Sequence, residues 1–298
     1  MRTTTILAAS ATLVALSGTA HALSFNNTFS FGTDPRAAQF QTAIGLAEAE
    51  FTSRYTDNIT INLTFQLAAG TGTLGSSSTP LVGNFTFAQI QTMLTNDATT
   101  ADDATAVASL GTASPTTSNF IMARAQAKAL GQIAGNNASS DGTITFGAGH
   151  TYAFDPNNRA VAGSFDFIGV AMHEISECMG RIGILGFASS LGINDLYRYS
   201  GNGTRALGSA LTPQTYFSIN SGATNLVNFN TVSGGDSMDY ASTADCFNAF
   251  TNTGIQNNFT TVGQRNMDVI GYDMVPEPAS MSVLALGAVA LIRRKKSK

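Results

Sequence analysis

The chain has 298 residues and a formal net charge of −4, and only 11% of its residues are charged, against roughly 25% in an ordinary soluble domain. Because 43% of the residues are hydrophobic, a sizeable core is available, and the low charge argues against disorder caused by charge repulsion. The chain has no basic surplus to neutralise phosphates, which argues against nucleic-acid binding, and its two cysteines are too few for a disulfide framework or a cysteine-rich zinc module.

The first 22 residues are typical of a secretory signal peptide. Arg2 supplies a positive charge, residues 6–16 form an apolar stretch, and residues 20–22 (Ala-His-Ala) have the small-x-small form that signal peptidase prefers. The alternative is an N-terminal helix buried in the fold. We therefore expect export by the Sec route, cleavage by signal peptidase, and a mature body that begins at residue 23.

The body from 23 to 275 shows helical and strand patterns in mixed order. Apolar residues at helical spacing predict a helix over 36–55, alternation predicts a strand over 58–67, and a Gly/Ser/Thr-rich loop follows at 70–80. Further along we expect helices near 86–96, 99–110 and 118–133, a short strand at 143–146, a helix over 165–181, and, after a turn-rich stretch with a few strands, a late helix near 261–270. This pattern predicts the α+β class, in one large domain or in two lobes sharing a core.

The tail, residues 276–298, has three ordered parts. Residues 276–278 (Pro-Glu-Pro) precede an apolar run at 279–292 and then a basic cluster at 293–296. The apolar run is shorter than the roughly 20 residues that span a bilayer comfortably, and the basic cluster would hold its end on the cytoplasmic side. This order resembles the PEP-CTERM sorting signal of Gram-negative bacteria. The resemblance implies a transient membrane anchor, cleavage by an exosortase and delivery to the cell exterior; the alternative is a plain anchor without processing.

The segment 171–181 reads Ala-Met-His-Glu-Ile-Ser-Glu-Cys-Met-Gly-Arg and contains the main candidates for metal-binding and catalytic residues. On a helix His173 and Glu177 share one face, and Glu174 follows the histidine. In the H-E-x-x-H helix of zinc peptidases the outer positions bind Zn²⁺ and the glutamate is the general base. Here the pattern is H-E-x-x-E, which is chemically possible because a carboxylate also binds zinc. The alternative is an ion pair between Glu177 and Arg181 beside a histidine with ordinary hydrogen bonds.

Four segments, 155–181, 195–200, 216–222 and 268–272, resemble a family of secreted bacterial zincin-like metalloproteases with PEP-CTERM tails. The resemblance implies a zincin-like fold, in which a mixed sheet and helices form two lobes around an active-site helix. It also implies that His173 and Glu177 are ligands of Zn²⁺ and that Glu174 is the catalytic base. Gly180 matches the glycine at which metzincin-type helices turn sharply.

The third ligand is left open by the sequence. Gly183 stands where a metzincin has its third ligand. Asp195 is the first candidate and His150 the second, whereas Asp236 and Asp239 are weaker. The alternatives are a turn aspartate at Asp195 and a loop histidine at His150.

Other side chains allow more than one interpretation. Cys178 and Cys246 could form a disulfide in an oxidising compartment, or Cys178 could be a small buried hydrophobic residue. Met238 is either a residue beneath the metal or a core methionine. Three tyrosines are candidate oxyanion donors, with core packing as the alternative: Tyr197, Tyr199 and Tyr240.

The sequence therefore predicts a secreted zinc-dependent endopeptidase that acts on a polypeptide substrate with a zinc-activated water, from which Glu174 removes a proton. The competing hypothesis is a non-catalytic extracellular matrix or surface protein built on a degenerate zincin scaffold. A carbohydrate-binding surface protein is a third interpretation, although the chain contains no tryptophan.

Overall fold

The structure is a computed structural model, and it describes residues 23–185, 189–208, 211, 213–241 and 244–276. The predicted signal peptide (1–22) lies outside the described residues, as does nearly all of the predicted sorting signal (277–298). Within the described ranges, no helix combines the length and the apolar character needed to cross a bilayer.

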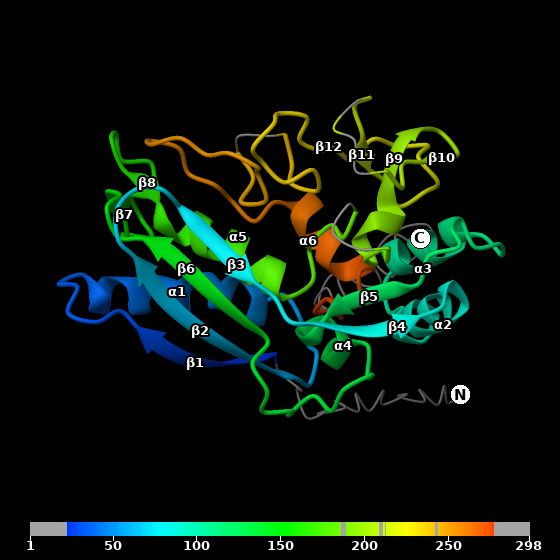
Figure 1. The fold of residues 1–298 in the computed structure, drawn as a ribbon, viewed down its shortest axis with the longest axis horizontal. Coiled ribbons are helices and arrows are strands. Elements are labelled where there is room, and N and C mark those ends of the chain that lie inside the picture. The colour runs from blue at the N-terminus through cyan, green and yellow to red at the C-terminus, as the bar shows by residue number, and fades with distance from the viewer. Residues whose placement is uncertain (1–22, 186–188, 209–210, 212, 242–243, 277–298) are drawn as a thin grey trace, which may run out of the picture.

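A four-stranded mixed sheet in the order β1-β2-β6-β3 forms one side of the molecule (Figure 1). β1 (Ser24–Ser30), β2 (Thr60–Ala68) and β6 (Gly142–Gly147) run parallel to one another. The edge strand β3 (Gly75–Ser78) runs antiparallel to β6, with Gly75 opposite Phe146. The sheet therefore ends on one side in a short strand of small residues.

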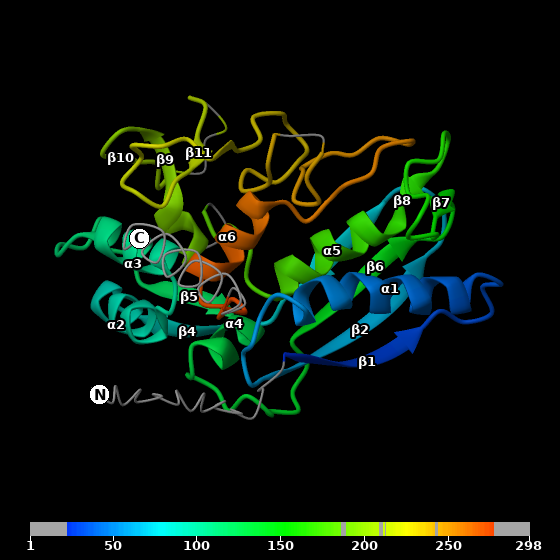
Figure 2. The same cartoon turned by 180° about the vertical axis from the view of Figure 1, so that it is seen from behind.

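Two helices, α1 (Ala37–Thr52) and α5 (Phe167–Cys178), cover one face of this sheet (Figure 2). Along β2 the apolar side chains Ile61, Leu63 and Phe65 are buried on that face, whereas the Thr, Asn and Gln side chains between them are half-buried on the other. This alternation is typical of a sheet that is covered on one face only.

Phe167 anchors the first turn of α5 to the rest of the fold. Its ring centroid lies 4.9 Å from that of Phe40 on α1 and 4.7 Å from that of Phe146 on β6, in edge-to-face geometry. The buried N-cap residue Asp166 accepts hydrogen bonds from Gly169 N (3.2 Å) and from the Arg159 guanidinium (2.8 and 2.6 Å). The start of α5 is thus fixed by packing and by a buried ion pair.

The other side of the molecule contains shorter elements, with α6 between the two sides (Figures 1 and 2). A two-stranded sheet and a second small sheet in the order β10-β9-β11-β12 lie there. The remaining elements are β4 (Leu81–Phe85), α2 (Phe87–Asp97), α3 (Ala101–Leu110), β5 (Phe120–Ala123), α4 (Arg124–Ala129), β7 (Tyr152–Ala153), β8 (Phe165–Asp166), the 3₁₀ helix η1 (Asn194–Tyr197), β9 (Arg198–Gly201), β10 (Thr204–Arg205), β11 (Tyr216–Phe217), β12 (Val227–Asn228) and α6 (Thr261–Val269). β4 and β5 form the two-stranded sheet on this side, whereas β7 and β8 pair with each other on the side of the main sheet, near the start of α5 (Figure 1).

The α+β class and most predicted elements are confirmed. The predicted helices at 36–55, 86–96, 99–110, 165–181 and 261–270 correspond to α1, α2, α3, α5 and α6, and the predicted strands at 58–67 and 143–146 correspond to β2 and β6.

Two predictions were wrong. The predicted helix over 118–133 is instead the strand β5 followed by the short helix α4, because the buried side chains Phe120 and Met122 extend the backbone into pairing with β4. The predicted loop at 70–80 contains β3, which is a strand because its backbone pairs with β6 and not because of its side chains.

Candidate metal centre

A cavity of about 500 Å³ opens where the edge strand β3, the helix α5 and the irregular segment before α6 meet. Leu74 and β3 form one wall, and α5 contributes His173, Glu174 and Glu177. The opposite wall comes from residues 234–239 and 245–257. In Figure 1 this irregular segment, coloured yellow to orange, runs above α5.

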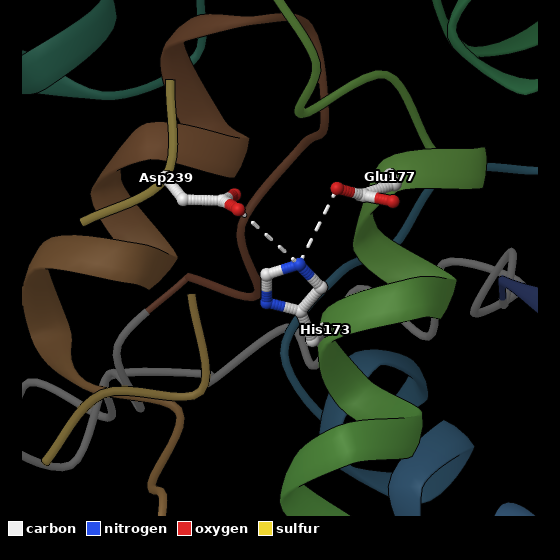
Figure 3. A group of neighbouring side chains, drawn as sticks. All are labelled: His173, Glu177 and Asp239. Atoms are coloured by element: carbon white, nitrogen blue, oxygen red, sulfur yellow. Dashed lines mark ion pairs between the residues drawn. The ribbon is translucent and has the colours of Figure 1, made fainter. Parts of the chain in front are cut away.

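Three side chains, His173, Glu177 and Asp239, converge inside this cavity (Figure 3). His173 Nε2 lies 3.3 Å from Glu177 Oε1 and 3.7 Å from Asp239 Oδ2, and one ligand atom from each residue lies within 4.8 Å of the others. The i,i+4 spacing on α5 sets His173 beside Glu177, as the sequence predicts. One imidazole and two carboxylates could therefore hold a metal ion.

The orientation of His173 is fixed by the chain on the far side of its ring. Nδ1 lies 2.9 Å from the backbone oxygen of Cys246, and a carbonyl oxygen only accepts hydrogen bonds, so Nδ1 carries a proton. In the neutral ring Nε2 is then the acceptor, and it faces the two carboxylates and the Arg181 guanidinium. Metal-binding histidines are usually oriented by such a bond from the second ring nitrogen.

Each carboxylate also has its own partner. Ser77 on the edge strand β3 donates to Glu177 Oε2 at 2.7 Å, so the strand helps to position the acid. Arg181 Nη1 donates to Asp239 Oδ1 at 2.8 Å. Ser77 and Arg181 thus leave Glu177 Oε1 and Asp239 Oδ2 to face the imidazole.

Arg181 is buried, with a side chain that is 1% exposed, and its positive charge partly compensates the carboxylates of Glu177 and Asp239. Its Nη2 is 3.4 Å from His173 Nε2 and 3.7 Å from Glu177 Oε1, so the predicted pairing of Glu177 with Arg181 exists but is looser than the pairing of Arg181 with Asp239. The guanidinium carbon lies 4.3 Å from the centroid of the Phe247 ring, a cation–π contact.

Glu174 lies in the same cavity without a partner. It is 5% exposed, and its Oε2 is buried with no hydrogen bond from any described residue. A side chain at position 75 would collide with Glu174 Oε1, so the glycine of β3 makes room for this acid. A buried carboxyl group without a hydrogen-bond partner is unusual, which indicates that Glu174 is protonated or binds a ligand.

The pKa values of these groups are set by burial and by neighbouring charges. Burial lowers the pKa of His173, but the carboxylates of Asp239 and Glu177 outweigh it and raise this pKa to about 10. Burial raises the pKa of Glu177, but His173, Arg181 and Ser77 lower it to about 2. Burial raises the pKa of Asp239 to about 6 and, with the charge of Glu177, raises that of Glu174 well above its usual range.

These residues fit a divalent cation. With a neutral His173, the two negative charges of Glu177 and Asp239 exceed the single positive charge of Arg181. Glu174 adds a third carboxyl group, which has no partner for its buried oxygen. A cation at this point would supply the missing positive charge, in place of the proton that His173 otherwise carries.

Asp195 and His150, the two leading candidates for the third ligand, lie outside this cluster. The Asp195 carboxylate accepts hydrogen bonds from Gly192 N (2.8 Å) and Ile184 N (3.1 Å), so it ties its own loop together. His150 Nε2 lies 3.1 Å from the backbone oxygen of Thr73, in the loop role that the sequence left as its alternative.

Asp239, one of the two weaker candidates, is the third member of the group that could hold a metal ion. Between α5 and Asp239 the described chain forms only one 3₁₀ helix and four short strands, so it gives no periodic signal that would have ranked Asp239 first.

The other interpretations are resolved in part. Cys178 and Cys246 are free, buried thiols, so the structure favours the second interpretation, in which Cys178 is a small buried residue. Met238 is 1% exposed and packs so closely against Gly183 that a side chain there would collide with it. The three candidate tyrosines are buried core residues, and none is among the residues that line the cavity: Tyr197, Tyr199 and Tyr240.

Comparisons with known proteins returned no matching family model, no matching curated protein and no matching solved structure.

The third ligand can be tested with two matched substitutions. Asp239→Asn should weaken Zn²⁺ binding by at least about tenfold, because it removes a carboxylate that faces His173 Nε2. Asp195→Asn should leave the affinity within about twofold, because Asp195 caps backbone groups elsewhere. Competition with a chelating dye measures both. A larger loss in Asp195→Asn than in Asp239→Asn would reverse the assignment.

Zinc affinity should also depend on pH. Metal binding requires a neutral His173, whereas the raised pKa of about 10 keeps the ring protonated in the metal-free site at neutral pH. The apparent Zn²⁺ affinity should therefore rise at least about tenfold per pH unit between about pH 7 and 9, with at least about one proton released per ion bound, and a second where Glu174 also ionises. Calorimetric titration in two buffers of different ionisation enthalpy measures the released protons; no release would contradict this linkage.

Proposed function

We propose that the protein is an exported, metal-dependent endopeptidase of the zincin type. The observation that carries the proposal is that the metal-binding group and an unpartnered buried glutamate share one cavity. His173, Glu177 and Asp239 converge there, and Glu174 lies one residue along α5 from the histidine. Binding a cation and abstracting a proton at one place is what metal-assisted hydrolysis requires.

Each residue has a separate role in this proposal. His173, Glu177 and Asp239 would hold a zinc ion, and zinc in such a site supplies a Lewis acid and a water that loses its proton near neutral pH. Glu174 would accept that proton as the general base. In the metal-free site its raised pKa keeps it protonated, and a nearby cation favours the ionised form that a base needs.

The edge strand supports the choice of a polypeptide substrate. Leu74, Gly75, Ser76 and Ser77 line the cavity, and β3 has no neighbouring strand on its outer side within the described sheet. The backbone groups of such an edge can pair with an extended peptide. A peptide bound along β3 would pass over Glu174, because Gly75 lies directly against that side chain.

The zincin-like fold is part of the same proposal. The features that support it are a mixed sheet, a helix with the H-E-x-x-E residues packed along it, and a cavity between that helix and an irregular half. The proposed third ligand differs from that of metzincins. It is an aspartate from a distant segment, whereas metzincins have their third ligand close to the helix. Export through signal peptidase, and a transient membrane anchor that an exosortase releases at the cell surface, remain proposals from the sequence.

A non-catalytic surface protein is the second candidate, and Arg181 is the observation that favours it. The guanidinium contacts Asp239 and approaches both Glu177 and His173. With a protonated His173, these four side chains form a neutral buried network without any metal. A degenerate zincin scaffold could be stabilised in this way.

The general base can be tested by Glu174→Gln. This substitution keeps the shape of the side chain but removes its basicity, so it should lower hydrolysis of an unstructured protein such as casein by at least about 10²-fold while zinc remains bound. Glu48→Gln on α1, outside the cavity, is the matched control and should retain full activity. Hydrolysis that survives in Glu174→Gln would reject the role of Glu174.

A further inference from the structure

The cavity beside the metal-binding group is lined by acids. Among the described residues that line it, five have carboxylic side chains and none is a lysine or an arginine. These five are Glu174, Glu177, Asp236, Asp239 and Asp245. A carboxylate at the wall of a cavity attracts a cationic side chain of a ligand and repels an anionic one.

Four of the five acids are accounted for by the group around His173, by the proposed base or by hydrogen bonds. Glu177 and Asp239 face His173, and Glu174 lies deep in the cavity, 5% exposed, with a buried oxygen that has no partner. Asp245 is 3% exposed and accepts hydrogen bonds from Phe247 N and from the Thr260 hydroxyl. Glu177 is the most exposed of these four, at 15%, but both of its carboxylate oxygens are occupied, by Ser77 and by the approach to His173.

Asp236 differs from them, because it is half-buried at the cavity wall and is not a member of the group around His173. Its Oδ1 accepts a hydrogen bond from Met238 N at 2.7 Å, and its backbone oxygen accepts one from Asn230 Nδ2 at 3.1 Å, so the loop is fixed. Its second carboxylate oxygen, Oδ2, has no hydrogen bond from any residue in the described ranges. The preceding Gly234 and Gly235 have no side chains to cover it.

An exposed aromatic ring lies against the glycine that precedes this acid. Phe250 is 48% exposed and lines the cavity. Its ring lies against Gly235, where a Cβ atom would come within 2.8 Å of the ring carbons. A half-exposed ring and a carboxylate with a free oxygen thus flank the same glycine.

We propose that Asp236 and Phe250 form the recognition site for a lysine or arginine side chain of the polypeptide substrate. The aliphatic part of such a side chain covers an aromatic ring, its cation is attracted to the ring face, and its head group binds a carboxylate. An acidic side chain is repelled here, and an aliphatic one leaves Asp236 desolvated without a partner. The inference rests on the proposed function, because it assumes that the same cavity accepts a polypeptide.

Equilibrium binding tests the inference without any turnover. Two fluorescent peptides that differ only in lysine against norleucine are titrated into the zinc-supplemented protein carrying Glu174→Gln. The lysine peptide should bind about tenfold more tightly at low salt, which is the effect of one hydrogen bond to a charged group. Adding Asp236→Asn should remove this preference while leaving the Oδ1 acceptor for Met238 N in place.

The matched control is Asp155→Asn, which makes the same change of charge outside the cavity and should leave the preference intact. Equal binding of the two peptides, or an equal loss of preference in Asp155→Asn, would overturn the inference. Cleavage by the wild type without a lysine preference would overturn it and leave the endopeptidase standing. A preference that depends on Asp236, in a protein that cleaves no peptide, would support the recognition site and reject the endopeptidase.

Discussion

Two carboxylates, Glu177 and Asp239, lie inside the protein next to one imidazole, and their negative charges must be compensated by neighbouring groups. Burying an ionised carboxylate without a partner is strongly unfavourable, and removing one member of a buried pair destabilises a fold by about 3–5 kcal/mol. Here the compensation comes from Arg181 and from either a proton on His173 or a metal ion. The same geometry is therefore compatible with a metal-free, charge-neutral state and could also hold a metal ion.

The fold brings this cluster together from segments that are far apart in the chain. α5 supplies His173 and Glu177 and is fixed at its start by Phe167. The edge strand β3 orients Glu177 through Ser77, and the irregular segment orients His173 through the backbone oxygen of Cys246. A sheet edge, a helix and a loop thus meet at one imidazole, and the cavity lies between them.

The local part of the site could be predicted from the sequence. His173, Glu174 and Glu177 fall within one helical segment, so the i,i+4 rule was sufficient to place two of them beside each other and the third next to them. The third acid could not be ranked in the same way. Asp239 reaches the cluster through irregular chain whose path depends on tertiary contacts, whereas Asp195, the preferred candidate, is occupied by backbone N–H groups of its own loop.

The errors in the fold have a similar origin. β3 has the composition of a loop and is a strand only because β6 pairs with it, and the apolar residues of β5 suit a short helix until β4 and the core are in place. Both cases depend on partners distant in sequence.

The central claim is that His173 anchors a metal ion, and the most direct measurement is the metal content of the purified, zinc-supplemented protein beside His173→Ala and His150→Ala. We expect about one zinc per chain in the wild type and in His150→Ala, because His150 contacts only a loop backbone, and none in His173→Ala. Thermal melting of all three confirms that each is folded. A folded wild type without stoichiometric metal would contradict the claim and leave the network of Arg181, Asp239, Glu177 and a protonated His173 as the explanation of the site.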